Sequence, residues 1–357
     1  MATALPAAGP RVVTPASPPA AEASTPVGSE FRAAVLERYG AQAHKDKWLK
    51  PLLEGEIRSA FLMTEPQVAS SDATNVSMSC ELDGDEYVLN GEKWWSSGAG
   101  DPRTALYITM VRTPSDDRPR HRQHSQILVD PQTPGITKLR AMQVFGNPDA
   151  PHGHFHLKFE NVRVPKDHLL GERGRGFAAA QVRLATARIH HCMRSIGGAE
   201  LMIALMCERA GTRETFGRPI AQHDKIREFV ALSRVEIDQA RLLTLNAADA
   251  LDRKGGRGAQ AEISQIKLAV ARACYDVADR AVQVFGAMGV TDDSPVADFY
   301  AGMRALRIYD GPDEVHVRTI ARAEFDRQAA LHPEGLMRYL CTDFSDRSRW
   351  EGAPAHG

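Results

Sequence analysis

The stretch HFHLKFENVRVPKDHLLGERGRGF, residues 154–177, contains the change of pattern that decides the fold. In its first half, Phe155, Leu157 and Phe159 fall on one face of an extended chain and polar residues on the other. Such alternation is typical of a half-buried β-strand. From GERGRGF onward, apolar residues recur at helical spacing almost to the end of the chain. The stretch therefore separates a β region from a helical region.

Long amphipathic helices are predicted on the C-terminal side of this boundary. Apolar residues recur there at spacings of three and four, which places them on one face of each helix. They are Ile226, Phe229, Val230, Ile237 and Ala240 in one helix, and Ile263, Ile266, Val270, Ala273, Val277, Ala281 and Val284 in the next. Gly211 and the glycine pair at 255–256 separate the helices, as antiparallel connections require. We predict a four-helix bundle over 171–335 and a tail over 336–357.

A β domain is predicted on the N-terminal side, over residues 59–170. SMSCELDGDEYVLNGEKW (77–94) has two strand-like arms around Asp83-Gly84, which is a hairpin signal. The apolar runs ALYITMVR (105–112) and SQILVD (125–130) have the length of strands. We expect an antiparallel, barrel-like domain.

The first residues of the chain look different again. Residues 1–28 are dominated by Ala, Pro, Ser and Thr, which favours a disordered tail because little apolar surface can be buried. Residues 29–58 read as two short helices, the first closing at Gly40. The predicted fold class is α+β: a short helical segment, a β domain and a helix bundle.

Composition excludes several classes of function. A net charge of -1 over 357 residues gives no electrostatic footprint for nucleic acid. No apolar run is long enough to span a membrane. The five cysteines form no CxxC pair, which favours a reducing compartment. We expect a soluble protein of the cytoplasm, or of the mitochondrial matrix if the source is eukaryotic.

Five motifs follow one another along the chain. They are TEPQVASSD (64–72), KWWSSGAG (93–100), RETFG (213–217), QVFGAMGV (283–290) and IYDGPDEVH (308–316). On composition alone, the first two are better explained by ordinary turns than by a ligand site. In this order and spacing, however, the motifs resemble the acyl-CoA dehydrogenase family over roughly residues 30–325. RIHHCMR (188–194) and DGPDEVH are similar to one branch of that family.

The resemblance implies FAD as cofactor. The residues it assigns to FAD are Met63, Thr64, Ser71, Trp95, Ser97, Gly311 and Glu314. Within this set, Trp95 is expected to pack against the flavin, and Ser97 to hydrogen-bond flavin N5. Ser71 is expected near the phosphates and the pantetheine of the substrate. Arg188 and His191 are further substrate residues that the resemblance implies.

The helical motifs imply an oligomer. In the family, residues at these positions reach the FAD of a neighbouring subunit. In this sequence they are Arg213, Thr215, Phe216, Gln283 and Gly286. A guanidinium at Arg213 suits a pyrophosphate because its planar fork gives paired donors. The expected assembly is a homodimer or a homotetramer.

Asp310 stands where the resemblance implies the catalytic base, which removes the α proton of the acyl thioester. Most relatives have Glu at this position, so the carboxylate here is one methylene shorter. Others carry the base just before the residue matching Arg188, but Ala187 stands there. We expect burial to raise the pKa of Asp310 above about 3.9. The alternative is that Asp310 caps the helix starting near Asp313.

The sequence also departs from the family pattern. Pro312 replaces a usual Thr, and Glu314 and His316 lie where neutral or basic residues are more common. We expect Asp313 and Glu314 to form an acidic first turn of the last helix. Family members usually carry several more helices before the TEP motif. The acyl pocket of this chain is therefore expected to lack part of its wall.

Other clusters are predicted to carry no chemistry. His152, His154 and His156 alternate along a strand without Cys or Asp nearby, so no metal site is expected. His191 and Cys192 are neighbours on a helix and face apart, which excludes a nucleophilic dyad between them. GERGRGF lacks the Lys-Ser/Thr ending of a phosphate-binding loop.

The predicted function is FAD-dependent oxidation of a fatty acyl-CoA to the trans-2-enoyl-CoA, with electrons passed to an electron-transferring flavoprotein. Two alternatives stay open. One is an inactive, shortened paralogue that acts only as an oligomer partner. The other is an enzyme of the same family with oxygen as acceptor, or with a hydroxylated or phosphorylated acyl-CoA as substrate.

Overall fold

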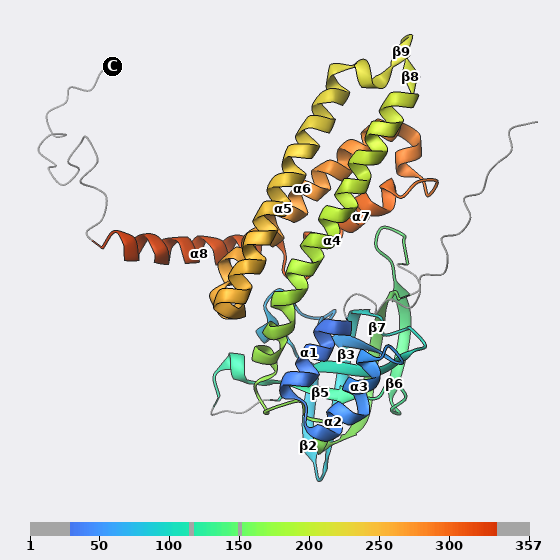
Figure 1. The fold of residues 1–357 in the computed structure, drawn as a ribbon. Helices are drawn as coiled ribbons and strands as arrows, with labels where there is room; N and C mark the ends of the chain where they lie inside the picture. Colours follow the sequence, from blue (N-terminus) through green and yellow to red (C-terminus); the bar gives the residue numbers. More distant parts are fainter. Residues whose placement is uncertain (1–28, 114–117, 149–151, 334–357) are drawn as a thin grey trace, which may run out of the picture.

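The computed structural model describes residues 29–113, 118–148 and 152–333. A sheet and a set of long helices form two regions that meet along helix α4 (Figure 1). The chain is therefore a mixed α+β protein with a curled sheet and a helical C-terminal region, as predicted. The tails predicted at 1–28 and 336–357 lie outside the described residues.

The β region is a single seven-stranded sheet in the order β1-β4-β2-β3-β7-β6, with β5 paired to β4. The strands are β1 (Arg58–Leu62), β2 (Ser79–Asp83), β3 (Glu86–Ser97), β4 (Thr104–Arg112), β5 (His124–Val129), β6 (Ile136–Met142) and β7 (His154–Pro165). The prediction of an antiparallel domain is wrong for β4, which pairs in parallel with β1 and β2. It is correct for the pairs β2–β3, β3–β7, β4–β5 and β6–β7.

Strand β7 confirms the alternation from which the fold was deduced. Leu157 and Phe159 are fully buried in the sheet core, while their polar neighbours are partly exposed. The predicted hairpin is also present, since Asp83 pairs with Glu86 and Gly84 takes a positive φ of 63° in the turn. Side chains from both strands of this hairpin enter the same core.

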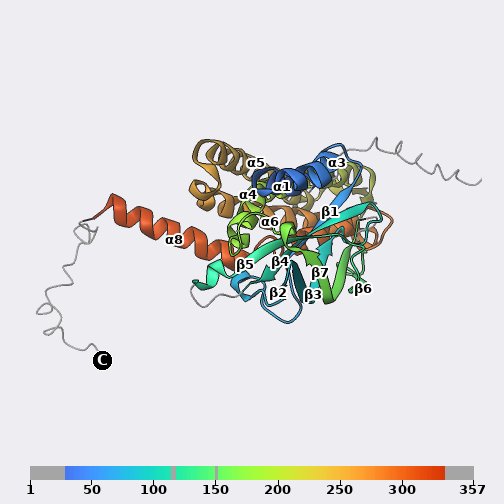
Figure 2. The same cartoon turned by 90° about the horizontal axis from the view of Figure 1, so that it is seen from below.

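The N-terminal helices cover part of the sheet. They are α1 (Ser29–Tyr39), α2 (Gln42–His44) and α3 (Lys50–Leu53), with a π-helical stretch at Lys45–Leu49. Leu36, Trp48 and Leu52 are buried against Ile108 of β4 and Leu128 of β5. α1 and α3 thus lie over the sheet beside the first turns of α4 (Figure 2).

The C-terminal region consists of long helices joined by short turns. They are α4 (Gly176–Thr212), α5 (Asp224–Gly258), α6 (Gln260–Phe285), α7 (Val296–Leu306) and α8 (Asp313–Leu331), with a small hairpin of β8 (Glu214–Thr215) and β9 (Arg218–Pro219). The predicted apolar face of α6 is buried, except that Ala273 is partly exposed. Gly255 takes a φ of 70° where α5 gives way to α6, and Gly211 lies in the last turn of α4. No helix in the described part of the chain is long and apolar enough to cross a membrane.

Helix α4 connects the two regions. It has 37 residues, so it is about 55 Å long at the usual rise per residue. Its first turn is fixed to the sheet, because Gln126 Nε2 donates to the Gly176 carbonyl at 3.0 Å and a Cβ on Gly176 would lie 2.6 Å from the Ser125 backbone. Its far end reaches the β8–β9 hairpin (Figure 1). Residues on α4 can therefore serve sites at both ends.

Candidate active site

Asp310 lies in the short connection between α7 and α8. It has a positive φ of 54°, and Gly311 after it has a φ of 104°. Asp tolerates the left-handed region better than most residues, and Gly311 has no Cβ to clash. A Cβ on Gly311 would lie 2.7 Å from Nε2 of the buried His316. This tight turn therefore fixes the position from which the Asp310 side chain starts.

The Asp310 carboxylate faces α4. Its Oδ2 lies 3.1 Å from His191 Nε2, and its Oδ1 lies 3.6 Å from Arg183 Nη2. Arg188 Nε donates to the Asp310 backbone carbonyl at 2.8 Å. Three α4 residues thus hold the loop and its carboxylate. Of these, Arg188 and His191 were expected near the substrate, while Arg183 was not predicted at all.

The prediction of a raised pKa for Asp310 is wrong. Burial by itself raises the pKa of this carboxyl, as predicted. The hydrogen bond from His191 and the charges of Arg183 and Arg188 outweigh burial, so the pKa lies well below its usual range. Asp310 is therefore ionised, as a base must be, but its basicity is weakened by its partners.

The reading of Asp310 as a helix cap is also wrong. The residue at the cap position of α8 is Pro312, and its side chain makes no capping bond. Asp313 starts the helix and is buried, with its Oδ2 at 2.9 Å from Arg307 Nε and 3.4 Å from Arg272 Nε. Glu314 follows on an exposed position. The predicted acidic first turn is thus present, and Asp313 also holds the end of α7 against α8.

A buried lysine on α6 also supports the turn that carries Asp310. Lys267 of α6 is buried, and its Nζ donates to the Leu306 carbonyl at the end of α7. Its ammonium lies 5.4 Å from the centroid of the Tyr309 ring. Burial lowers the pKa of Lys267 to about 8. Burial also lowers the pKa of His316 to about 4, with the charges of Arg188 and Lys267 acting in the same direction.

The TEP loop is fixed by a buried ion pair that the sequence analysis missed. Glu65 Oε1 lies 2.7 Å from Lys93 Nζ, and both side chains are almost completely buried. Glu65 also accepts hydrogen bonds from Ser77 N, Ser77 Oγ and the Met78 N–H, and Lys93 donates to the Met63 carbonyl. Burial alone raises the pKa of Glu65, but the charge of Lys93 and these donors keep it below its usual range. The available signal was one Glu in TEPQVASSD and one Lys of opposite charge in KWWSSGAG.

These contacts bring the two predicted flavin loops together. The Trp94 N–H donates to the Thr64 carbonyl at 3.0 Å, which ties Met63 and Thr64 to the start of KWWSSGAG. Trp95 has a positive φ of 51°, and its side chain is 38% exposed. Its outward position leaves a ring face on which a planar ligand can pack.

The hydroxyl of Ser97, expected at flavin N5, already has a partner. Ser97 Oγ lies 2.8 Å from His154 Nδ1, and the His154 ring lies 5.5 Å from the Trp95 ring. His154 is therefore part of this loop cluster. In contrast, Ser71 is exposed on the loop after the TEP motif, and its neighbour Ser70 accepts from the Glu65 N–H at 3.1 Å.

The flavin residues predicted in the helical motifs lie elsewhere. Arg213 follows the last residue of α4, about 35 Å along the helix from Arg188. Arg209 lies over the Phe285 ring at 5.7 Å, which joins the tip of α4 to the tip of α6 where Gln283 and Gly286 stand. The structure therefore collects the predicted residues into two separate groups at opposite ends of α4.

The group at the far end of α4, called here the tip group, can contact a ligand or another chain. Phe216 is 93% exposed and has a positive φ of 50°, a costly conformation for an aromatic residue. Arg213 and Gln283 are exposed beside it on the same tip. An apolar ring and a guanidinium fit a flavin nucleotide. FAD therefore fits these residues only if one group comes from each of two chains.

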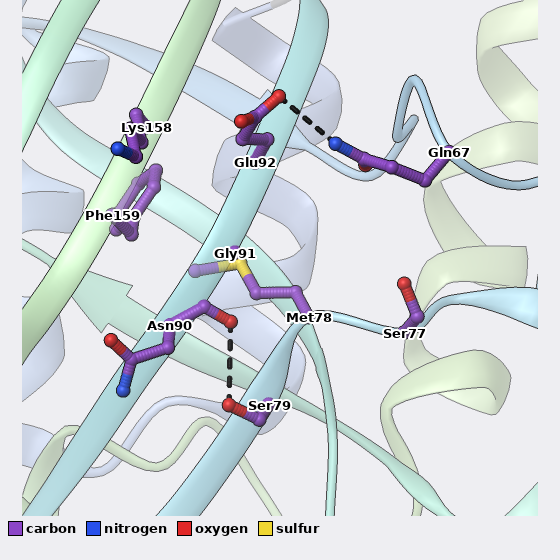
Figure 3. A pocket seen from close by; sticks show the side chains of 9 residues that line it. All are labelled: Gln67, Ser77, Met78, Ser79, Asn90, Gly91, Glu92, Lys158 and Phe159. Carbon is purple, nitrogen blue, oxygen red and sulfur yellow. Dashed lines mark hydrogen bonds between the residues drawn. The ribbon is translucent and has the colours of Figure 1, made fainter.

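A separate cavity of about 260 Å³ opens along β3, between β2 and β7 (Figure 3). Its polar wall is tied together by hydrogen bonds from Gln67 to Glu92 and from Ser79 to the Asn90 carbonyl. Glu92 also pairs with His156 at 2.9 Å. Asp310 and its partners do not line this cavity.

No cluster of possible metal ligands occurs among the residues that the structure describes. Two of the histidines considered for zinc have other contacts: His154 meets Ser97, and His156 meets Glu92.

Comparisons of sequence and structure show which known proteins this chain resembles. Residues 60–162 match the acyl-CoA dehydrogenase middle domain, and residues 174–325 match the acyl-CoA dehydrogenase C-terminal domain. The protein named "Probable acyl-CoA dehydrogenase FadE2" of Mycobacterium tuberculosis is 51% identical over 294 residues, which cover 82% of this chain and 72% of that protein.

Acyl-CoA dehydrogenase family member 11 of Gallus gallus is 50% identical over 291 residues, but this chain spans only 38% of that longer protein. A solved structure from Mycobacterium abscessus, assigned to the acyl-CoA dehydrogenases, superimposes with a TM-score of 0.82 at 45% identity. The superposition covers 84% of this chain and 74% of the Mycobacterium abscessus chain.

Proposed function

This chain belongs to the acyl-CoA dehydrogenase family, and on that premise we propose that it oxidises a fatty acyl-CoA with Asp310 as the base. The observation that carries the proposal is the position of Asp310. Its carboxylate is ionised and faces α4, and its backbone is fixed by the left-handed turn and by the hydrogen bond from Arg188 to its carbonyl. No carboxylate is available at Ala187, the other position where the family places the base.

The chemistry asked of these residues is proton removal next to a thioester. FAD, when bound, supplies the acceptor for the β hydrogen. Asp310 takes the α proton, which requires a positioned carboxylate because this proton is weakly acidic. The Asp310 N–H makes no backbone hydrogen bond within the described residues, so it is available to the thioester oxygen. Base and donor would then come from the same residue.

The cofactor is proposed to lie between two chains. The loop group with Met63, Thr64, Trp95 and Ser97 would hold the flavin ring of one subunit. The tip group around Arg213 and Phe216 would come from a neighbour, since α4 keeps the two groups of one chain apart. This arrangement supports a homodimer or homotetramer, with α4 to α7 forming the family's four-helix bundle. An intracellular location and an electron-transferring flavoprotein as acceptor complete the proposal.

The visible spectrum of the purified protein tests this function. We expect a flavin absorption band that bleaches when an acyl-CoA is added without oxygen. Asp310→Asn should keep the band and abolish bleaching. A colourless protein that cannot be reconstituted with FAD would exclude the proposal, and normal reduction of the Asp310→Asn variant would exclude the base.

The ion pairs of Asp310 favour one competing reading, an inactive oligomer partner. A carboxylate held by His191 and Arg183 is a weaker base than a free one. The same spectrum decides: an inactive partner would assemble into oligomers but would not be reduced by acyl-CoA.

A further inference from the structure

His191 is held on both sides of its ring. Its Nε2 lies 3.1 Å from Asp310 Oδ2, and its Nδ1 lies 3.3 Å from Arg194 Nη2. A guanidinium can only donate hydrogen bonds, so Nδ1 must be the acceptor of that contact. The ring proton is then on Nε2 and is donated to Asp310. Arg194 therefore selects one neutral tautomer of His191.

The charged form of His191 does not fit this arrangement. An imidazolium has N–H groups on both nitrogens, and its Nδ1–H would point at the donors of Arg194. His191 also cannot act as the base itself, since both of its nitrogens are engaged. The Tyr309 ring packs edge-on against the imidazole at a centroid distance of 5.3 Å, which fixes the plane of the ring.

We propose that His191 is a positioning residue for the base: it holds Oδ2 of Asp310 and so leaves Oδ1 to take the α proton. This proposal rests on the proposed function. Among the described residues, Oδ1 has only the longer contact of 3.6 Å with Arg183, beyond hydrogen-bond length. In the step, the substrate Cα–H bond breaks and an O–H bond forms at Oδ1. The electron pair of the Cα–H bond forms the Cα=Cβ bond as the β hydrogen leaves with its own electron pair, for which bound FAD would be the acceptor.

The length of the base explains why it needs such a partner. Asp has one methylene less than the Glu usual in the family, so a rotation of its carboxylate changes the position of each oxygen relative to a substrate. A misplacement of about 1 Å can cost a factor of 10² in rate. The N–H of His191 defines this rotation.

The surroundings of His191 and Asp310 are strongly cationic. The charged or titratable groups that face them are Arg183, Arg188 and Arg194 on α4, Lys267 on α6, Tyr309 in the turn and His316 on α8. The tautomer that Arg194 selects holds Asp310 through an N–H and adds no further positive charge to these surroundings.

Kinetics of flavin reduction by an acyl-CoA test the positioning role. His191→Phe keeps the ring shape without the N–H, and we expect kcat to fall about 10- to 100-fold with KM and FAD content little changed. His191→Gln restores a donor near Nε2 and should recover most of this loss. His332→Phe makes the same change at an exposed position just after α8 and should leave kcat near the wild-type value.

Rescue by the conservative variant separates this role from a purely structural one, because glutamine restores a donor without the ring. A normal kcat in His191→Phe would overturn the proposal. So would a His191→Gln variant that is no faster than His191→Phe.

A second measurement does not depend on activity. In the full-length protein labelled with ¹⁵N at histidine, the signal missing in His191→Gln identifies His191. We expect a protonated Nε2 and an unprotonated Nδ1 at neutral pH. The opposite tautomer, or two protonated nitrogens, would overturn the role of Arg194. If the wild type showed this tautomer but reduced no flavin, the proposed function would fail while the tautomer assignment stood.

Discussion

Lys93 Nζ lies 2.7 Å from Glu65 Oε1 in the interior of the protein, and this pair joins the two loops expected to hold the flavin. Both residues belong to motifs that were read for ligand contacts, yet their side chains point into the protein. A buried charge that loses its partner is costly. The main role of the pair is therefore to hold the two loops together.

Lys93→Met should destabilise the protein by about 3–5 kcal/mol, since it leaves Glu65 charged and buried. The free energy of unfolding in urea measures the effect. Lys166→Met breaks the exposed pair with Asp85 and should have no measurable effect. Equal stability of Lys93→Met and wild type would show that the ion pair does not hold these loops.

Gly311→Ala should slow flavin reduction more than it lowers stability. The added Cβ meets Nε2 of His316 at 2.7 Å, and the backbone φ of 104° disfavours any side chain. The turn must shift, and Asp310 shifts with it. We expect kcat to fall at least about tenfold. Gly84→Ala, at a turn where the added atom meets nothing within 4 Å, is the matched control for backbone strain alone.

The stability of the protein should fall as the pH drops from about 6.5 towards 4. His316 is neutral in the folded state because burial, with the charges of Arg188 and Lys267, lowers its pKa to about 4. In the unfolded state it titrates near 6.5, so the unfolded chain binds more protons in this window. The contribution is up to about 3 kcal/mol.

His316→Gln should therefore show a weaker loss of stability between pH 7 and pH 5 than the wild type, measured as urea unfolding at each pH. His121→Gln, at an exposed position, should follow the wild type. An unchanged pH dependence in His316→Gln would mean that other buried groups cause the loss.

Arg183→Met should make Asp310 a stronger base. The methionine keeps an apolar stem against Phe61, over which the guanidinium lies at 4.6 Å, but removes a positive charge from the carboxylate. The pKa of Asp310 rises, so the acidic limb of the rate profile should move to higher pH. Arg253→Met, at a surface pair, should leave the profile in place. A shift to lower pH would contradict the assignment.

Phe216→Ala should weaken FAD binding without destabilising the single chain. The ring is 93% exposed, so its loss removes little from the folded chain. If it packs against the flavin of a neighbour, the lost burial corresponds to roughly 10- to 100-fold weaker FAD binding. FAD content after dialysis measures this. Phe325→Ala on α8 removes another exposed ring and should retain FAD.

The parts of the fold that could be predicted are those with a periodic pattern and a buried face. Strand β7 and helix α6 have one each, and both were found. Strand β6 was missed because its residues from Thr137 to Ala141 are all exposed, so no alternation marks it. The parallel pairing of β1 with β4 was missed because the choice of a distant partner leaves no local trace in the sequence.

The candidate site shows the same limit. Asp310 and Arg188 were found from motifs, and the structure places them in contact. Arg183 carries no motif and meets Asp310 only in the folded chain. The one available signal was its spacing: Arg183 and His191 are eight residues apart, which puts them on the same side of a helix. A sequence cannot show that a carboxylate lies opposite that side.

Helix α4 carries the partners of Asp310 near one end and leads directly into Arg213 at the other. Successive residues of an α-helix are rotated by about 100° about the helix axis. If the tip group meets the loops of an adjoining subunit, as proposed, a single insertion between Arg188 and Arg213 would rotate it out of alignment while leaving both groups chemically intact. The length of α4 and the rotation along it therefore both set how the two groups face each other. A change in its length would preserve that orientation only if it added or removed whole helical turns.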